Sequence, residues 1–257
     1  MTTHDGFDPA TFDPAAYGSS AAADYDALHA ELDPSDAVQA LAALAGTGDV
    51  LEFGLGTGRL ALPLVDLGFT VHGIEGSPAM VEALRAKPGG SEVPVVVGDF
   101  SRANTGKDDY SLVVLAINTI FALPSQEAQV SCFQNASRHL VTGGRFVVEA
   151  WVPDVGAFRN LSAVRPVRVH DGHIELEVAT IDPSTQTMWT NKMHVTDTGV
   201  RLIAANHRYA WPSEMDLMAR LAGMRLVHRW QDWNQSTFRD VSTSHISVWQ
   251  KVSDHAV

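Results

Sequence analysis

Residues 50–60 contain an apolar run that passes through Glu52 into glycines at alternate positions, Gly54, Gly56 and Gly58, and then into a helical pattern. This order predicts a strand, a tight turn and a helix N-terminus. Glycine permits positive φ and, because it has no side chain, lets a ligand approach the backbone. In a doubly wound fold such a turn lies at the carboxyl end of the first strand, where ligands bind. The stretch therefore predicts an α/β fold with a ligand site at this turn.

The glycine spacing distinguishes two kinds of ligand in part. The dinucleotide fingerprint is Gly-x-Gly-x-x-Gly, with a pyrophosphate at the helix N-terminus. Here Gly58 comes one residue early, and Glu52 would repel a pyrophosphate but suits a cationic amino-acid group. The pattern Glu52-x-Gly54-x-Gly56-x-Gly58 resembles motif I of class I S-adenosylmethionine (SAM)-dependent methyltransferases. A glycine turn without a nucleotide is the alternative.

Two further acidic residues follow at intervals of one βα unit. Glu75 ends the second predicted strand, residues 69–75, about 20 residues beyond the first glycine, where a carboxylate accepts hydrogen bonds from both ribose hydroxyls of an adenosine. Dinucleotide-binding proteins share this feature, so it indicates adenosine without choosing between the two families. Asp99 and Phe100 follow the third predicted strand, and the methyltransferase resemblance implies that they contact the adenine amino group and ring.

The same resemblance implies the rest of the cofactor site. It comprises the ends of the second, third and fourth strands and a residue from an N-terminal segment that folds over the cofactor as a lid. The further residues expected to bind SAM are Tyr17, Gly76, Ser77, Met80, Gly98, Ala116 and Ile117.

Residues 17–152 resemble the small-molecule branch of these enzymes, of the methyltransferase domain 25 type. The expected fold is an α/β, doubly wound, seven-stranded and mostly parallel Rossmann-like sheet. Alternating segments after strand five predict a small antiparallel β insertion. The expected parts are lid helices in 1–45, the SAM-binding core in 46–152, the insertion as a substrate cap in 153–211, and the last helix and two strands in 212–257.

The end of strand five, the inserted sheet and the last helix resemble sugar N-methyltransferases of macrolide biosynthesis. The Asn118-Thr119-x-Phe121 pattern resembles peptide N-terminal methyltransferases of natural products. The resemblance implies methyl transfer from SAM to an amine nitrogen of a small secondary metabolite, by in-line displacement, with alignment as the main catalytic contribution. Two alternatives stay open: an O- or C-methyltransferase with a general base, and a non-catalytic SAM- or adenosine-binding module. A NAD-dependent enzyme is disfavoured by the glycine spacing.

Candidate residues for the acceptor lie around strand five and in the insertion. Glu149 is expected to bind or orient an amine, the alternative being a buried carboxylate that holds the insertion in place. His207 is a candidate to reach the acceptor, although a structural role is the more common one for a histidine. Aromatic side chains here could line a pocket for a sugar or a methylated ammonium group. The alternative is that they pack in the core. The expected substrate-binding residues are Asn118, Phe121, Trp151 and Trp189.

Composition limits the partners. The formal charge of −12 argues against nucleic acid, because neutralising phosphates needs clustered Lys and Arg. Cys132 is the single cysteine, and the eleven histidines include no His-x-x-x-His pair backed by carboxylates on one helix, so no metal is expected. No apolar run approaches the ~20 residues of a membrane span. The sequence thus predicts a cytoplasmic protein with a small-molecule acceptor, no nucleic-acid or membrane partner, and a possible homodimer through the insertion.

Overall fold

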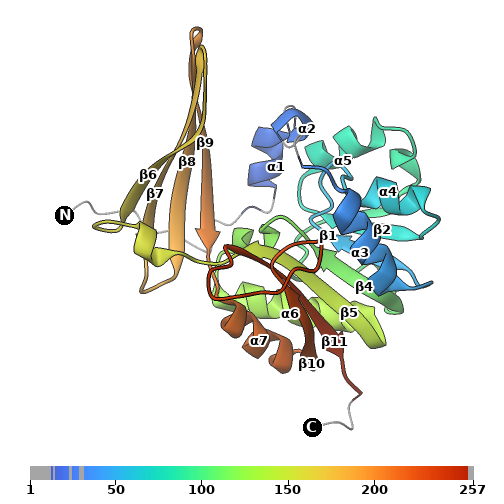
Figure 1. Ribbon diagram of the computed structural model, residues 1–257. Coiled ribbons are helices and arrows are strands. Elements are labelled where there is room, and N and C mark those ends of the chain that lie inside the picture. Colours follow the sequence, from blue (N-terminus) through green and yellow to red (C-terminus); the bar gives the residue numbers. More distant parts are fainter. Residues whose placement is uncertain (1–12, 14, 23–24, 29–31, 254–257) are drawn as a thin grey trace.

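The computed structural model describes residues 13, 15–22, 25–28 and 32–253. Its centre is a seven-stranded sheet of order β10-β11-β5-β4-β1-β2-β3 (Figure 1). β11 runs antiparallel to β10 and β5, and the other neighbours in the sheet are parallel. The strands are β1 (Val50–Phe53), β2 (Val71–Glu75), β3 (Val95–Val97), β4 (Tyr110–Leu115), β5 (Leu140–Trp151), β10 (Met224–Trp230) and β11 (Ser244–Lys251).

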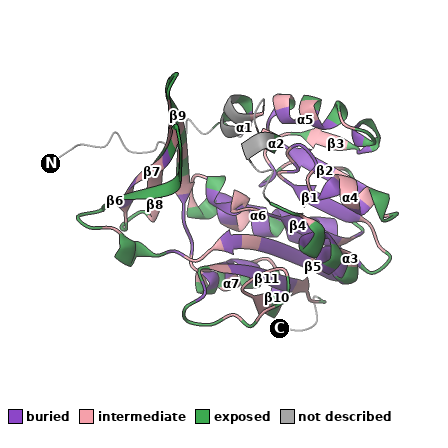
Figure 2. Ribbon diagram, turned by 45° about the horizontal axis from the view of Figure 1, so that its top comes forward, coloured by how far each residue is buried: buried purple, intermediate pink, exposed green. Residues whose placement is uncertain are grey.

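Helices cover both faces of this sheet, because its central strands are apolar on both sides. On β4, Leu112 and Val114 belong to one buried cluster and Val113 and Leu115 to the other, as expected for a strand of a parallel sheet. Figure 2 shows the resulting buried centre. The first cluster includes residues of α3 (Ser35–Ala45), α4 (Ala61–Asp66) and α5 (Pro78–Arg85), and the second residues of α6 (Gln126–His139) and α7 (Pro212–Leu221).

Two short helices, α1 (Ala16–Ala21) and α2 (Tyr25–Leu28), precede α3. Short 3-10 turns lie at Gly90–Glu92 (η2), Thr119–Ala122 (η3) and Val155–Ala157 (η4). Among the described helices, none is both long and apolar enough to cross a membrane.

A second sheet follows β5 in the chain and stands beside the first (Figure 1). It is antiparallel, of order β6-β7-β8-β9. It lies within residues 153–211, the segment expected to form the insertion, so the predicted fold class is confirmed. Its strands are β6 (Ser162–His170), β7 (His173–Asp182), β8 (Thr187–Thr196) and β9 (Gly199–Arg208).

Arg208, at the end of β9, joins the second sheet to the core. Its guanidinium donates to Gln129 on α6, to Gln186 before β8 and to Glu214 on α7, at 2.7 Å from Glu214 Oε1. Gln129 donates in turn to the carbonyl oxygen of Arg208 at 2.8 Å. Burial pushes the pKa of Glu214 upward, but hydrogen bonds from Gln186, Arg208 and Gln126 hold it below its usual value.

Replacing Arg208 by Ala is expected to destabilise the fold by about 3–5 kcal/mol, because it leaves the Glu214 carboxylate without its charged partner in a buried site. Urea unfolding measures the loss. Arg165→Ala is the matched control on the same sheet: Arg165 pairs with Glu177 at 2.8 Å, but its side chain is 70% exposed. That loss should stay below about 1 kcal/mol. Equal losses in the two variants would contradict the anchoring role of Arg208.

Candidate active site

The glycine turn connects β1 to α4 at the carboxyl edge of the parallel strands. Gly54, Gly56 and Gly58 all have positive φ, at 62°, 58° and 85°. The turn is held to β2, because the Gly54 N–H donates to the carbonyl oxygen of Ile74 at 2.8 Å. A Cβ added to Gly58 would lie 2.5 Å from Leu84 Cδ1, whereas one added to Gly56 would meet nothing closer than the Tyr25 ring at 3.9 Å. Gly58, at the end of the turn, is therefore closely packed, whereas Gly56, in its middle, has space beside it.

Glu75, at the end of β2, ties this turn to the start of α5. Its Oε2 accepts from the Gly56 N–H and its Oε1 from the Ser77 N–H, both at 2.8 Å. Burial raises its pKa, and the hydrogen bonds from Ser77, Gly56 and Gly76 oppose the rise. A carboxylate has about four lone-pair sites. Each oxygen can therefore accept a further hydrogen bond, such as one from a ribose hydroxyl.

Glu52, on β1, is a buried carboxyl group beside the turn. Its Oε2 has no hydrogen-bond partner in the described part of the chain. Burial raises its pKa from 4.5 to about 8, and the charge of Glu75 adds to this, against the opposing effects of Arg59 and the Ala61 N–H. A cation or hydrogen-bond donor that comes near a buried acid of this kind favours its anionic form. The orphaned oxygen therefore fits the cationic amino-acid end of SAM.

The N-terminal helices pack over the same turn. Asp26 on α2 accepts from the Thr57 hydroxyl at 2.6 Å and pairs with Lys87 at 2.7 Å. On α1, a Cβ added to Gly18 would lie 2.4 Å from Ser77 Cβ, so the two backbones approach closely there. Sequence reasoning missed Asp26, because nothing in its local pattern indicates a partner 31 residues away in the chain.

The third strand contributes a second polar group beside Glu75. The Gly98 N–H donates to the carbonyl oxygen of Glu75 at 2.9 Å, and Asp99 accepts from the Ser101 N–H at 2.8 Å. Phe100 is buried, its ring centroid 6.0 Å from that of Phe53. Asp99 thus lies next to the predicted ribose site, while Phe100 packs into the core. Their contacts with adenine stay predictions.

The end of β4 has an unusual backbone that Glu149 holds in place. Ile117 and Asn118 have positive φ, at 45° and 60°. Glu149 Oε2 accepts from the Ile117 N–H and its Oε1 from Trp233 Nε1–H, each at 2.9 Å. Asn118 Oδ1 accepts from the Trp151 N–H at 2.7 Å. Glu149 therefore positions the backbone between β4 and β5, and Trp233, which sequence reasoning missed, fixes its other oxygen.

Aromatic rings line the junction between the core and the second sheet. The Phe121 and Trp151 ring centroids are 4.4 Å apart, Trp151 and Tyr209 6.4 Å, and Tyr209 and Trp211 5.3 Å. Phe121 is fully buried and Trp151 is half-buried. The structure thus brings two of the expected acceptor residues together, with Phe121 covered by its neighbours.

His207 and Trp189 lie on opposite faces of the second sheet. His207 pairs with Met188, and consecutive strand residues such as Met188 and Trp189 point to opposite sides. Burial, with the charge of Lys192, lowers the pKa of His207 to about 4. His207 is therefore neutral and weakly basic at neutral pH, and it does not share a face with Trp189.

Three other expected residues lie close to the turn or to the end of β4. Ser77 caps α5 by accepting from the Met80 N–H, and Met80 is buried under Gly18. Ala116 is buried before Ile117. Tyr17 belongs to α1, but its side chain lies outside the described part of the structure.

Comparison with known proteins matches this geometry to one family. A family model described as a methyltransferase domain matches residues 50–144. The methyltransferase CcbJ from Streptomyces caelestis has a similar structure, with a TM-score of 0.86 and 36% sequence identity; the match covers 94% of this chain and 100% of CcbJ.

Two further similarities cover less of the sequence or are more distant. The sugar N-methyltransferase KedS8 from Streptoalloteichus shares the fold, with a TM-score of 0.63, 18% identity, and coverage of 89% of this chain and 93% of KedS8. An uncharacterised methyltransferase from Geobacillus is 46% identical over 65 residues. That match spans 25% of this chain and 30% of the relative's length.

Proposed function

Because the chain belongs to the SAM-dependent methyltransferases, we propose that it methylates an amine nitrogen of a small-molecule secondary metabolite. The observation that carries the amine assignment is the state of Glu149. Both of its oxygens accept hydrogen bonds from the fold, from Ile117 and Trp233, which fix the carboxylate in place, and each oxygen keeps a lone pair that could accept from an ammonium group. An oxygen acceptor needs a general base, whereas a neutral amine presents its lone pair directly. His207, with a pKa of about 4, is a poor base as well.

The residues of the site have distinct roles in this account. SAM, when bound, supplies the methyl group and leaves as S-adenosylhomocysteine. Glu52 would bind its cationic end, Glu75 would accept from the ribose and Asp99 would accept from the adenine amino group. Gly56 would leave room for the adenosine, and the Ile117–Asn118 backbone would help to position the methionine portion and the acceptor. Alignment of this kind contributes up to ~7–11 kcal/mol.

The acceptor amine needs no acid for its attack, and its surplus proton goes to water after the carbon–nitrogen bond forms. If the amine binds as ammonium, it loses one proton to water before the transfer. Trp151, the half-buried ring of the aromatic junction, would then cover the methylated ammonium, because ring faces attract cations. KedS8, a sugar N-methyltransferase of the same fold, supports an amine acceptor.

Mass spectrometry across amino sugars, peptide N-termini and phenols tests the acceptor class. We expect methylated product from amines and none from phenols, with S-adenosylhomocysteine released in step. Methylated phenols would favour the O-methyltransferase alternative. A protein that binds SAM but releases no S-adenosylhomocysteine with any of these acceptors would instead be a binding module.

Replacing Glu149 by Gln is expected to preserve turnover of an amine of α-amino type at about pH 9, where an amine with a pKa of about 8 is largely neutral. The amide still accepts one of the two hydrogen bonds, so a fold cost of about 1–3 kcal/mol accompanies the change. Initial rates of S-adenosylhomocysteine release at about pH 7 and about pH 9 measure the effect. Trp233→Phe is the control, since it removes one hydrogen bond and keeps the carboxylate. Loss of activity at every pH in Glu149→Gln alone would show that the carboxylate is a base.

The remaining expectations concern the surroundings of the enzyme. A cytoplasmic location and a small-molecule acceptor stay predictions. So does a homodimer through the second sheet, where Val164, Val169 and Val200 are exposed and would be covered by a second copy.

A further inference from the structure

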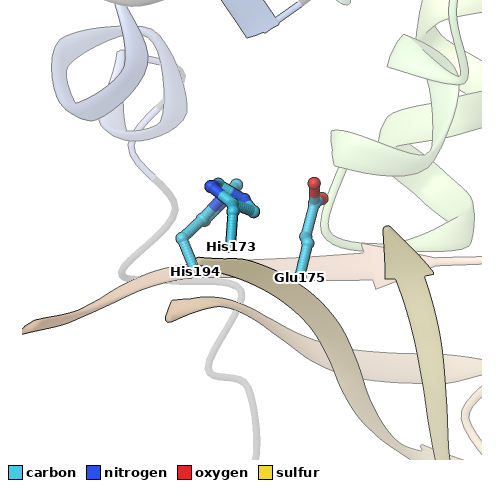
Figure 3. A group of neighbouring side chains, drawn as sticks. All are labelled: His173, Glu175 and His194. Atoms are coloured by element: carbon cyan, nitrogen blue, oxygen red, sulfur yellow. The ribbon is translucent and has the colours of Figure 1, made fainter. Parts of the chain in front are cut away.

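A group of polar side chains on the second sheet supplies opposite charges from within itself. His173, Glu175 and His194 rise from one face of this sheet (Figure 3). Arg168 lies directly opposite Glu175 on β6, and Arg201 lies directly opposite His194 on β9. The Glu175 carboxylate therefore has basic neighbours on both adjacent strands, and this face calls for no added cation.

Helix α6 differs, because it buries an amide group against the loop that follows β3. Asn135 is only 1% exposed. Its Nδ2 donates to the carbonyl oxygens of Phe100, at 2.8 Å, and of Ala103, at 2.9 Å. Its Oδ1 accepts from the Arg138 guanidinium at 3.0 Å. Both amide hydrogens are thus used, which offsets the cost of burying a polar group.

The two carbonyl oxygens that Asn135 binds belong to the turn that begins at Asp99. The carbonyl oxygen of Asp99 accepts from the Arg102 N–H at 3.0 Å and from the Ala103 N–H at 2.7 Å. Asp99 Oδ1 accepts from the Ser101 N–H at 2.8 Å, whereas no described residue donates to its Oδ2. The turn therefore fixes the Asp99 carboxylate and leaves one of its oxygens available to a ligand.

Helix α6 holds the same loop a second time, one helical turn further on. His139 Nε2 accepts from the Thr105 N–H at 3.3 Å, so the neutral ring carries its proton on Nδ1, 2.8 Å from the carbonyl oxygen of Asn135. At its start the loop is attached to β2, because the Gly98 N–H donates to the carbonyl oxygen of Glu75 at 2.9 Å. The loop is thus held by β2 at one end and by α6 along the rest of its length.

We propose that Asn135 is a positioning residue that holds Asp99 against the adenine amino group and makes the cofactor site specific for adenine over hypoxanthine. This inference rests on the proposed role of Asp99. Hypoxanthine has a carbonyl oxygen where adenine has its amino group, so it offers the carboxylate no hydrogen there. A site built to accept from an amino group rejects such an analogue, because its own polar atom is left unpaired. Local sequence does not indicate Asn135, whose partners lie 35 and 32 residues away.

Calorimetry of the full chain with S-adenosylhomocysteine and with its deaminated analogue, S-inosylhomocysteine, tests the inference, because the two ligands differ only in the base. The wild type should bind the adenine ligand at least ~10-fold more tightly, as expected for a hydrogen bond to a charged group. Asn135→Leu keeps the approximate size of the side chain and removes both donors. In this variant the ratio of the two affinities should fall at least ~5-fold, through weaker binding of the adenine ligand.

Gln129→Leu is the matched control on the same helix. Gln129 is also a fully buried amide, and its Nε2 donates to two carbonyl oxygens, those of Ile120 at 3.1 Å and of Arg208 at 2.8 Å. Thermal unfolding should show lower stability in both variants, but the ratio of affinities should keep its wild-type value in Gln129→Leu. A ratio that is unchanged in Asn135→Leu, or that falls equally in both variants, would overturn the inference.

Asp99→Asn separates the inference from the role of Asp99 itself. An amide side chain can donate to the hypoxanthine oxygen, so the ratio should fall in this variant as well. A wild-type ratio in Asp99→Asn would overturn both roles, whereas a fall in Asp99→Asn without one in Asn135→Leu would overturn that of Asn135 alone. If Asn135→Leu does not fold, Asn135→Ser replaces it. Its single hydroxyl donor should lower the ratio by a smaller factor, and an unchanged ratio would again contradict the inference.

Discussion

Replacing Glu52 by Gln is expected to stabilise the free protein at alkaline pH. The folded-state pKa of Glu52 is raised from 4.5 to about 8, chiefly by burial. The folded protein therefore holds a proton that the unfolded chain releases above pH 4.5. The contribution of Glu52 to the free energy of unfolding is fully present below pH 4.5 and is lost as the pH rises to about 8. The loss is on the order of 5 kcal/mol at 1.36 kcal/mol per pKa unit.

Glutamine has no proton to lose, so the variant escapes this penalty. Thermal unfolding near pH 5 and near pH 9 measures the effect, at about 2–4 °C per kcal/mol for a chain of this size. The two proteins should melt alike at the lower pH and diverge at the higher one. Glu82→Gln, at an exposed position on α5, is the control and should show no divergence. A wild type that melts at the same temperature as Glu52→Gln at both pH values would contradict the buried-acid account.

The same substitution is expected to weaken SAM binding. In the proposed complex, ionised Glu52 would face the cationic end of SAM, and a hydrogen bond to a charged group contributes about 1.5–3 kcal/mol. The variant should therefore bind SAM about 10- to 100-fold more weakly. If Glu52→Gln stabilises the free protein and also weakens SAM binding, SAM binds the negative charge of Glu52.

Replacing Gly56 by Ala is expected to weaken SAM binding more than tenfold with only a modest loss of stability. Gly56 has φ of 58°, and the added Cβ would meet only the Tyr25 ring at 3.9 Å. The free protein thus bears the backbone strain of ~1–2 kcal/mol and no clash. In the complex the methyl group would occupy the space of the adenosine.

Gly68→Ala is the matched control for that change. Gly68 has φ of 91° at the end of α4, and its added Cβ meets nothing within 4 Å. Both variants should lose similar stability in thermal unfolding, and calorimetry should show SAM affinity reduced in Gly56→Ala alone. Equal SAM affinity in the two variants would contradict the position of the cofactor against the turn. Gly58→Ala would be a poor test, because its Cβ lies 2.5 Å from Leu84.

Much of the fold is predictable from local pattern. The alternation of residues 187–196 predicts a strand with the bounds of β8, and Ser77-Pro78 predicts the capped start of α5. Glu75 is placed beside Gly56 as expected, because parallel strands end at one edge of a sheet. These predictions succeed where one segment carries its own signal.

Pairings between distant segments are not predictable in this way. Glu149, expected to bind or orient an amine, accepts from Trp233, 84 residues away, a contact that its local sequence does not indicate. Phe121, an expected substrate-binding residue, is fully buried in the free protein, and residue type does not reveal what covers a side chain. Trp189 and His207 both carried acceptor-binding predictions, but the register of β8 and β9 places them on opposite faces.

Binding of SAM and of 5′-methylthioadenosine to the wild type and to Glu52→Gln tests the central claim most directly. Methylthioadenosine keeps the adenosine and lacks the amino-acid group. Calorimetry near pH 8 should show SAM affinity falling at least ~10-fold in the variant, with methylthioadenosine affinity unchanged. That result would assign Glu52 to the cationic end of the cofactor and the rest of the turn to adenosine. An equal fall for both ligands, or no fall for either, would contradict the account.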